Sequence, residues 1–102
     1  MKRDEIEREM SARSLTAPHV TAAGIDEKIT QEMYYIFPGT TTTVCCLVLA
    51  NDYTVTGQSA CVSPENFDED LGRRIAFSKA RDKIWALEGY LLREKLTADS
   101  TG

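Results

Sequence analysis

The chain has 102 residues and a formal net charge of −4, with 42% hydrophobic and 27% charged residues. A chain of this length forms one domain, and this composition is typical of soluble globular proteins. Nucleic-acid-binding domains usually carry a basic face, so the acidic balance disfavours nucleic acid as a partner. No apolar run approaches the length of a membrane helix, and we therefore expect no membrane partner.

The first 17 residues predict an N-terminal arm that is helical in part or flexible. Charges alternate through this segment, and Ile6 and Met10 form a single thin apolar stripe. Pro18 ends any helix that precedes it. The segment lacks the apolar region of a secretory signal peptide, so we expect a cytoplasmic protein.

Residues 18–97 are expected to form a single α+β domain. Its first element is a short helix over 21–32, with Thr21 as the cap and Ile25 and Ile29 as an apolar pair. The aromatic run 33–37 predicts a strand that ends at the turn pair 38–39. A β-hairpin over 42–60 follows, with 51–52 as its two-residue turn, and completes a small antiparallel sheet.

The two-residue turn predicts the pairing within the hairpin. It places Val48 opposite Val55 and Leu47 opposite Thr56. Both faces of strand 44–50 are then apolar, and we expect a second cover, either the 21–32 helix or another subunit. No two cysteines face each other in this register. We therefore expect reduced thiols at the three cysteines, Cys45, Cys46 and Cys61.

A long helix is predicted over 66–96, packed against the sheet. Asn66 is its expected cap, with Glu69 as the capping-box partner. The pairs Glu69–Arg73 and Asp70–Arg74 have the spacing that favours ion pairs on a helix. A disordered polar tail is expected over 98–102.

Two apolar stripes run along this helix on opposite sides. The first contains Phe67, Leu71, Ile75, Trp85, Leu92 and Leu96. The second is predicted to form an oligomer interface and contains Ala76, Ala80, Ile84, Leu87 and Leu91. A helix on the surface of a monomer needs only one stripe, so we expect a homo-oligomer. The alternative is that the N-terminal helices cover the second stripe.

Catalytic and metal-binding patterns are absent from the sequence. His19 is the only histidine, and no cysteine or acidic cluster lies near it in the chain. No phosphate-binding loop, dinucleotide fingerprint or nucleophile elbow is present. We therefore predict a protein that is not an enzyme, with no catalytic residue, no metal and no cofactor.

The remaining chemistry favours an anion. Lys79 and Lys83 are like charges four residues apart, an arrangement that a bound anion would stabilise. Arginine forks and aromatic faces suit a nucleotide phosphate and base. The candidate ligand-binding residues are Arg73, Arg74, Lys79, Lys83, Trp85 and Tyr90. The alternative is a solvated helix flank whose charges pair with one another.

Four segments together resemble a small phage-protein family with members in bacteriophages N4 and Sf6. These segments are GQSAC at 57–61, NFD at 66–68, GRRIA at 72–76 and IWALEGY at 84–90. The resemblance extends over about residues 18–96. It implies a phage or prophage gene whose product acts in the cytoplasm of the bacterial host cell.

The resemblance and the helix pattern together suggest a phage accessory protein that counters host defence. Its expected activity is the sequestration of a small anionic signalling nucleotide at a subunit interface, by analogy of architecture with oligomeric nucleotide-binding proteins of phages. The alternative is an adaptor or inhibitor that binds a host protein and has no small-molecule ligand.

Overall fold

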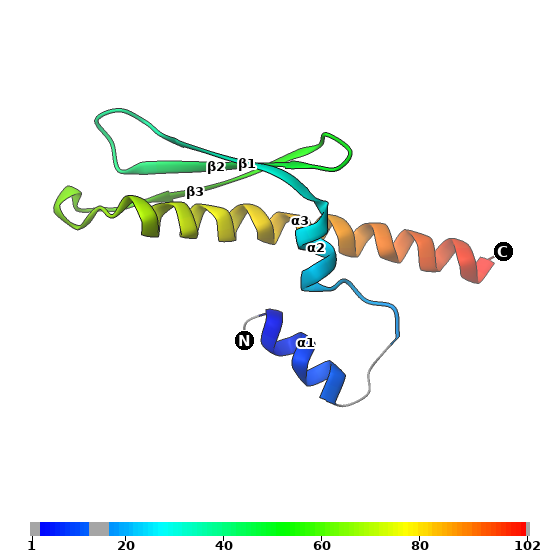
Figure 1. The fold of residues 1–102 in the computed structure, drawn as a ribbon. Coiled ribbons are helices and arrows are strands. Elements are labelled where there is room, and N and C mark those ends of the chain that lie inside the picture. The colour runs from blue at the N-terminus through cyan, green and yellow to red at the C-terminus, as the bar shows by residue number, and fades with distance from the viewer. Residues whose placement is uncertain (1–2, 13–16, 102) are drawn as a thin grey trace.

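The computed structural model describes residues 3–12 and 17–101 and has two main layers. One layer is a three-stranded antiparallel sheet with β2 (Thr42–Leu49) between β1 (Ile29–Ile36) and β3 (Thr54–Ala60). The other is the long helix α3 (Glu69–Thr101), with α2 (Ala22–Lys28) on the same side of the sheet and α1 (Arg3–Ala12) beyond it (Figure 1). The predicted α+β fold, with a hairpin followed by a long helix, is confirmed.

The region between α2 and β1 differs from the prediction. Thr21 caps α2 as expected, because its hydroxyl accepts a hydrogen bond from the Gly24 amide at 3.0 Å. The helix then ends at Lys28, and the last four residues of the predicted helix belong to β1. Ile29 and Thr30 are β-branched, and pairing with β2 outweighs the weak helical pattern there.

The predicted hairpin register is wrong by one residue. The connection has three residues rather than two, with Asp52 in the left-handed region at φ 68° and the Leu49 amide bonded to the Tyr53 carbonyl. Such a turn shifts the pairing, so that Leu47 lies opposite Val55 rather than Thr56. The apolar residues of both strands consequently point to the same face.

The core lies between that face and the helices. The buried face of β2 consists of Thr43, Cys45, Leu47 and Leu49. Ile25 of α2 and Ile84 of α3 are fully buried against it. The three cysteines are free thiols, as expected, and only Cys45 is fully buried.

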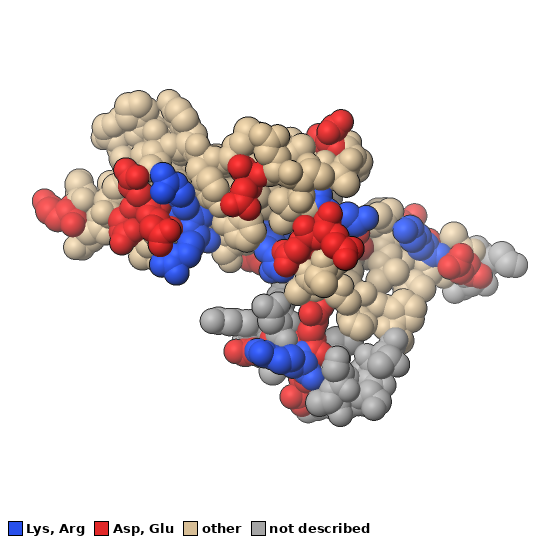
Figure 2. All heavy atoms as spheres, in the orientation of Figure 1, with Lys and Arg blue, Asp and Glu red and all other residues tan. Residues whose placement is uncertain are grey.

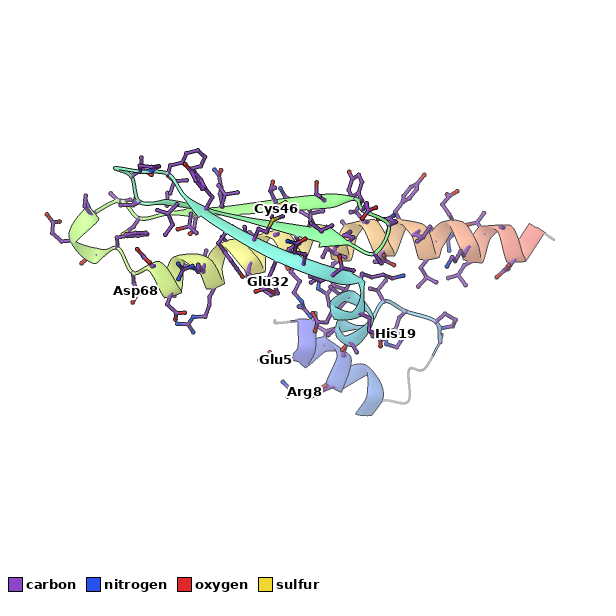
Figure 3. The ribbon with its side chains drawn as sticks, turned by 45° about the horizontal axis from the view of Figure 1, so that its top comes forward. Glu5, Arg8, His19, Glu32, Cys46 and Asp68 are labelled. Carbon is purple, nitrogen blue, oxygen red and sulfur yellow. The ribbon has the colours of Figure 1, made fainter. Side chains whose placement is uncertain are left out.

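Both ends of α3 differ from the prediction. The helix starts at Glu69, and Asp68 rather than Asn66 caps it, accepting a hydrogen bond from the Leu71 amide at 3.0 Å (Figure 3). Asn66 instead belongs to a 3-10 turn at Pro64–Asn66. The helix also continues to Thr101, beyond its predicted end at residue 96, whereas the disordered tail expected over 98–102 stays a prediction.

The second face of the sheet has no cover among residues 3–12 and 17–101. Both α2 and α3 lie on the core side (Figure 1). The open face includes Met33 and Tyr35, whose exposed fractions are 43% and 55%. The suggested cover by α2 is therefore wrong, whereas a cover by a second subunit stays a prediction. No helix in the described part of the chain is long and apolar enough to cross a membrane.

Candidate ligand groove

The structure does not bring the six candidate ligand-binding residues together. Arg73 and Arg74, near the start of α3, form ion pairs with Glu69 and Asp70 at 3.5 and 3.3 Å. These are the i,i+4 pairs that the sequence predicted. Each of the two guanidinium groups therefore has a carboxylate partner in the first turns of α3, where basic and acidic side chains lie side by side (Figure 2).

Trp85 lies on a different side of α3 from the lysines. Its side chain is buried in the core, with 9% of the residue exposed, and the Arg81 guanidinium lies 5.9 Å from its ring centroid. Arg81 also donates a hydrogen bond to the Asp26 carboxylate of α2 at 2.9 Å. Trp85 therefore helps to attach α2 to α3, and it does not reach the groove described next.

Lys83 and Tyr90 do come together, in a groove of about 490 Å³ between α3 and the tip of the hairpin. Tyr53, at the end of the hairpin turn, forms the opposite wall. The exposed fractions of Tyr53 and Tyr90 are 56% and 72%, so both rings are open to solvent. The other lining residues are Thr54, Val55, Thr56, Ala86 and Leu87.

The groove contains a positive charge that the structure leaves uncompensated. Lys83 makes no ion pair with any residue in the described ranges, and the same holds for Lys79 one helical turn earlier. The groove has no acidic lining residue. An ammonium group, two phenol rings and two threonine hydroxyls together can bind a phosphate, stack on a planar base and hydrogen-bond a sugar.

Sequence reasoning missed Tyr53 as a groove residue. The helical spacing of Lys83 and Tyr90 puts them on one flank of α3, which the sequence alone could show. Tyr53 reaches the groove because the tip of the hairpin lies against α3. The local sequence pattern does not indicate which part of α3 the hairpin tip contacts. The only indication in the sequence that Tyr53 could bind a ligand was its position as an aromatic residue beside the hairpin turn.

The predicted oligomer interface divides into two parts. Ala76, Ala80 and Ile84 are fully buried in this chain's own core. The sheet, and not a second chain, covers these three residues. Leu87 and Leu91 are 40% and 45% exposed and remain available on the surface of α3.

A second groove, of about 560 Å³, lies between β1 and α3 and includes Asp26, Glu32 and Arg81. Arg81 is engaged by Asp26, and the Glu32 carboxylate accepts a hydrogen bond from the Tyr34 hydroxyl at 3.1 Å. Burial, followed by the bond to Glu32, raises the pKa of Tyr34 above its ordinary value. The charges of this groove compensate one another, so it is the weaker candidate for an anion.

No group of three or more histidine, cysteine, aspartate or glutamate side chains in the described ranges could hold a metal ion. His19 is exposed and its Nδ1 lies 2.8 Å from the Ala17 carbonyl oxygen. His19 lines a small hollow together with Lys28, Glu88 and Lys95. This hollow is separate from the groove that contains Tyr53, Lys83 and Tyr90, which we call the Tyr53–Tyr90 groove.

Comparison with known proteins identifies the family. The model of the phage protein (N4 Gp49/phage Sf6 gene 66) family matches residues 20–96. This match extends over more than half of the chain and confirms the resemblance expected from the sequence; the chain belongs to this family of phage proteins. No curated protein and no solved structure matches the chain significantly.

Proposed function

We propose that this phage protein is a non-enzymatic binding protein that sequesters a small anionic ligand, a signalling nucleotide, in the Tyr53–Tyr90 groove at a subunit interface. In this role it counters a defence signal in the cytoplasm of the bacterial host cell. The observation that supports the proposal is that Lys83 lines the same groove as two solvent-exposed tyrosines, Tyr53 and Tyr90.

The size of the groove is suited to such a ligand. Its volume of about 490 Å³ is within the range of pockets that hold small molecules. The groove is open rather than enclosed, because β3 and α3 form two walls only. A ligand bound there by one chain remains exposed on its outer side, and a second chain is expected to complete the site.

Calorimetry with a panel of cyclic and linear nucleotides tests the proposal. At least one nucleotide is expected to bind the wild-type chain. The Lys83→Ala variant should weaken that binding by about 10-fold to 100-fold, the usual effect of losing a charged hydrogen bond. Tyr90→Ala should also weaken it, because base stacking on an aromatic ring contributes about 1–3 kcal/mol.

Arg93→Ala is the matched control. Arg93 is exposed on α3, does not line the groove, and its replacement removes one positive charge just as Lys83→Ala does. Affinity should change less than about twofold in this variant. If no nucleotide binds, or if Lys83→Ala and Arg93→Ala weaken binding equally, the proposed site is wrong.

The open sheet face favours a second candidate function, an adaptor or inhibitor that binds a host protein. Tyr35 and Phe37 are 55% and 46% exposed, and their rings form an edge-to-face pair with centroids 4.8 Å apart. Exposed aromatic pairs of this kind are common anchors of protein interfaces. Capture of one stoichiometric host protein by the wild-type chain, and its loss with Tyr35→Lys, would support this function in place of nucleotide binding.

A further inference from the structure

Strand β3 has a free edge with none of the features that prevent strands from pairing. Its seven residues include no charged residue, no proline and no bulge. The other edge of the sheet is protected twice, by an irregularity of pairing between Ile29 and Gln31 and by the acidic Glu32 on β1 (Figure 3). Proteins commonly block edges with these two devices, so β3 is the edge that remains able to pair.

The alternation of an antiparallel ladder shows which backbone groups are unpaired. At the base of the hairpin the Leu49 amide bonds to the Tyr53 carbonyl, and bonded pairs then recur at every second residue. Thr54, Thr56, Gln58 and Ala60 therefore direct their N–H and C=O groups away from β2. All four residues are exposed, and no described element lies against this edge.

We propose that β3 pairs antiparallel with β3 of a second copy of this chain, forming a continuous six-stranded sheet. The inference deepens the proposed function, because it names the subunit interface. Antiparallel pairing of a strand with itself is two-fold symmetric and presents the same surface on both subunits. The register that uses all four outward-facing residues places Gly57 opposite Gly57 of the second copy, and Thr56 opposite Gln58 of the second copy.

Exposed apolar residues of α3, which lie beneath the free edge of β3, favour a second copy of this chain over an unrelated partner. Leu71 and Ile75, on the flank of α3 that faces β3, are 47% and 39% exposed. Because α3 lies under β2 and β3, extending the sheet at β3 brings the second α3 alongside the first and antiparallel to it. The exposed apolar flank of each helix then gains a cover.

The contact approaches the size of a small stable interface. The strand is about 23 Å long, and the sheet and helix layers together are about 20 Å deep. The corresponding flat area is roughly 460 Å² per subunit, and the accessible surface buried exceeds it, which approaches the roughly 600 Å² per subunit of the smaller specific dimers. Like charges do not meet along the strands, because β3 has no charged residue.

This pairing would also complete the ligand groove. Thr54 and Thr56 form part of the groove wall and belong to the pairing edge. In the proposed register, Gln58 and Ala60 of the second copy lie next to them. The end of α3 that contains Leu71 in the second copy then faces the part of α3 that contains Lys83 and Tyr90 in the first. The second subunit would therefore add a third wall to each groove, beside the two walls that β3 and α3 of the first subunit form.

Hydrogen exchange of the wild-type chain is the direct test. In a monomer the amides of Thr56 and Gln58 exchange rapidly, although they lie in the middle of a strand, because they face solvent. In the proposed dimer these amides should be protected at least 100-fold, like those of Val55 and Gly57. Rapid exchange at Thr56 and Gln58 in a chain that light scattering shows to be a dimer would overturn the proposal, and so would a strict monomer at tens of micromolar.

Two variants distinguish dimerisation through the β3 edge from dimerisation through the open face of the sheet. Thr56→Pro removes one outward-facing amide, and proline is tolerated at such edge positions, so the variant should fold as a monomer. Val48→Lys places a charge on the open face of β2 and should stay dimeric. A dimer in Thr56→Pro, or a monomer in Val48→Lys alone, contradicts pairing at β3. If Thr56→Pro fails to fold, the exchange experiment on the wild-type chain still decides.

The two proposals fail in different ways. A dimer with protected Thr56 and Gln58 amides that binds no nucleotide would refute the ligand and leave the interface standing. A monomer that binds a nucleotide through Lys83 would refute the interface and leave the ligand standing.

Discussion

Gly57 of β3 and Ala80 of α3 are in direct backbone contact. A Cβ atom added to Gly57 would overlap the backbone nitrogen of Ala80 and the carbonyl oxygen of Ala76. The helix approaches the strand this closely because both of its contact residues are alanine. The small residues of α3 thus serve to pack one chain's helix against its own sheet, and this close packing explains why Ala76 and Ala80 are fully buried.

The first prediction concerns this contact. Gly57→Ala should lower the free energy of unfolding by about 3 kcal/mol or more, because backbone atoms on both sides must move to admit the methyl group. Urea denaturation followed by circular dichroism measures the change. A loss smaller than about 1 kcal/mol would show that the helix and strand are less close than the structure indicates.

Gly89→Ala is the matched control for this substitution. Gly89 lies inside α3, and a Cβ atom there would meet no atom of the described residues within 4 Å other than its chain neighbours and the surrounding helix backbone. Alanine is favoured over glycine in a helix interior, so stability should rise by about 0.5–1 kcal/mol. The two identical substitutions are therefore expected to have opposite signs.

A second pair of opposite effects is expected where β2 and β3 face the start of α3. Thr43 is fully buried, and its hydroxyl has no hydrogen-bond partner among the described residues, whereas the Ser59 hydroxyl donates to the Gly72 carbonyl at 2.8 Å. Thr43→Val removes the unsatisfied group at nearly constant volume and should raise stability by about 1 kcal/mol. Ser59→Ala should lower it by about 1 kcal/mol.

Thermal unfolding of these two variants measures the difference. For a domain of this size, about 1 kcal/mol corresponds to a change in Tm of roughly 4–8 °C. A lower Tm in Thr43→Val would mean that the Thr43 hydroxyl is satisfied in solution.

The helix caps provide a third prediction. Asp68→Ala should lower the free energy of unfolding by about 1 kcal/mol, because the Leu71 amide loses its hydrogen-bond acceptor at the start of α3. Asn66→Ala should change it by less than about 0.5 kcal/mol, since its side chain does not cap the helix. Equal losses in the two variants would support the cap that the sequence indicated instead.

The sequence predicted those parts of the fold that depend on local chemistry. The aromatic strand run, the cap at Thr21 and the i,i+4 pairs at the start of α3 are all determined by neighbouring residues. The hairpin register was wrong because Asp52 adopts a positive φ and Asn51 does not, whereas a two-residue turn of type I′ requires a positive φ at both; the connection therefore has three residues. A difference of one residue in a turn reverses the faces of an entire strand.

The candidate site was less predictable than the fold. Lys83 and Tyr90 share a flank of α3 because of helical geometry, and both line the groove. Tyr53 enters the groove from another element, and Trp85 turns away from it toward Arg81. Helical periodicity gives the direction in which a side chain projects from the helix axis. Only the tertiary arrangement shows which other element that side chain contacts.

The last prediction concerns alkaline pH. Burial raises the pKa of the Cys45 thiol, and burial together with the bond to Glu32 raises that of Tyr34. The folded chain therefore holds these two protons more tightly than the unfolded chain does, whose ordinary pKa values are 9.0 and 10.0. Their contribution to stability is fully present below about pH 8.5 and is lost as the pH rises through the folded-state values.

The unfolding midpoint in urea should consequently be constant between about pH 7 and 8.5 and should fall above about pH 9. Tyr34→Phe removes one of the two titrating groups and should make this fall less steep. Tyr90→Phe, the same substitution at a ring that is 72% exposed, is the matched control. An equal slope in Tyr34→Phe and the wild-type chain would show that the Tyr34 hydroxyl does not differ between the folded and unfolded states.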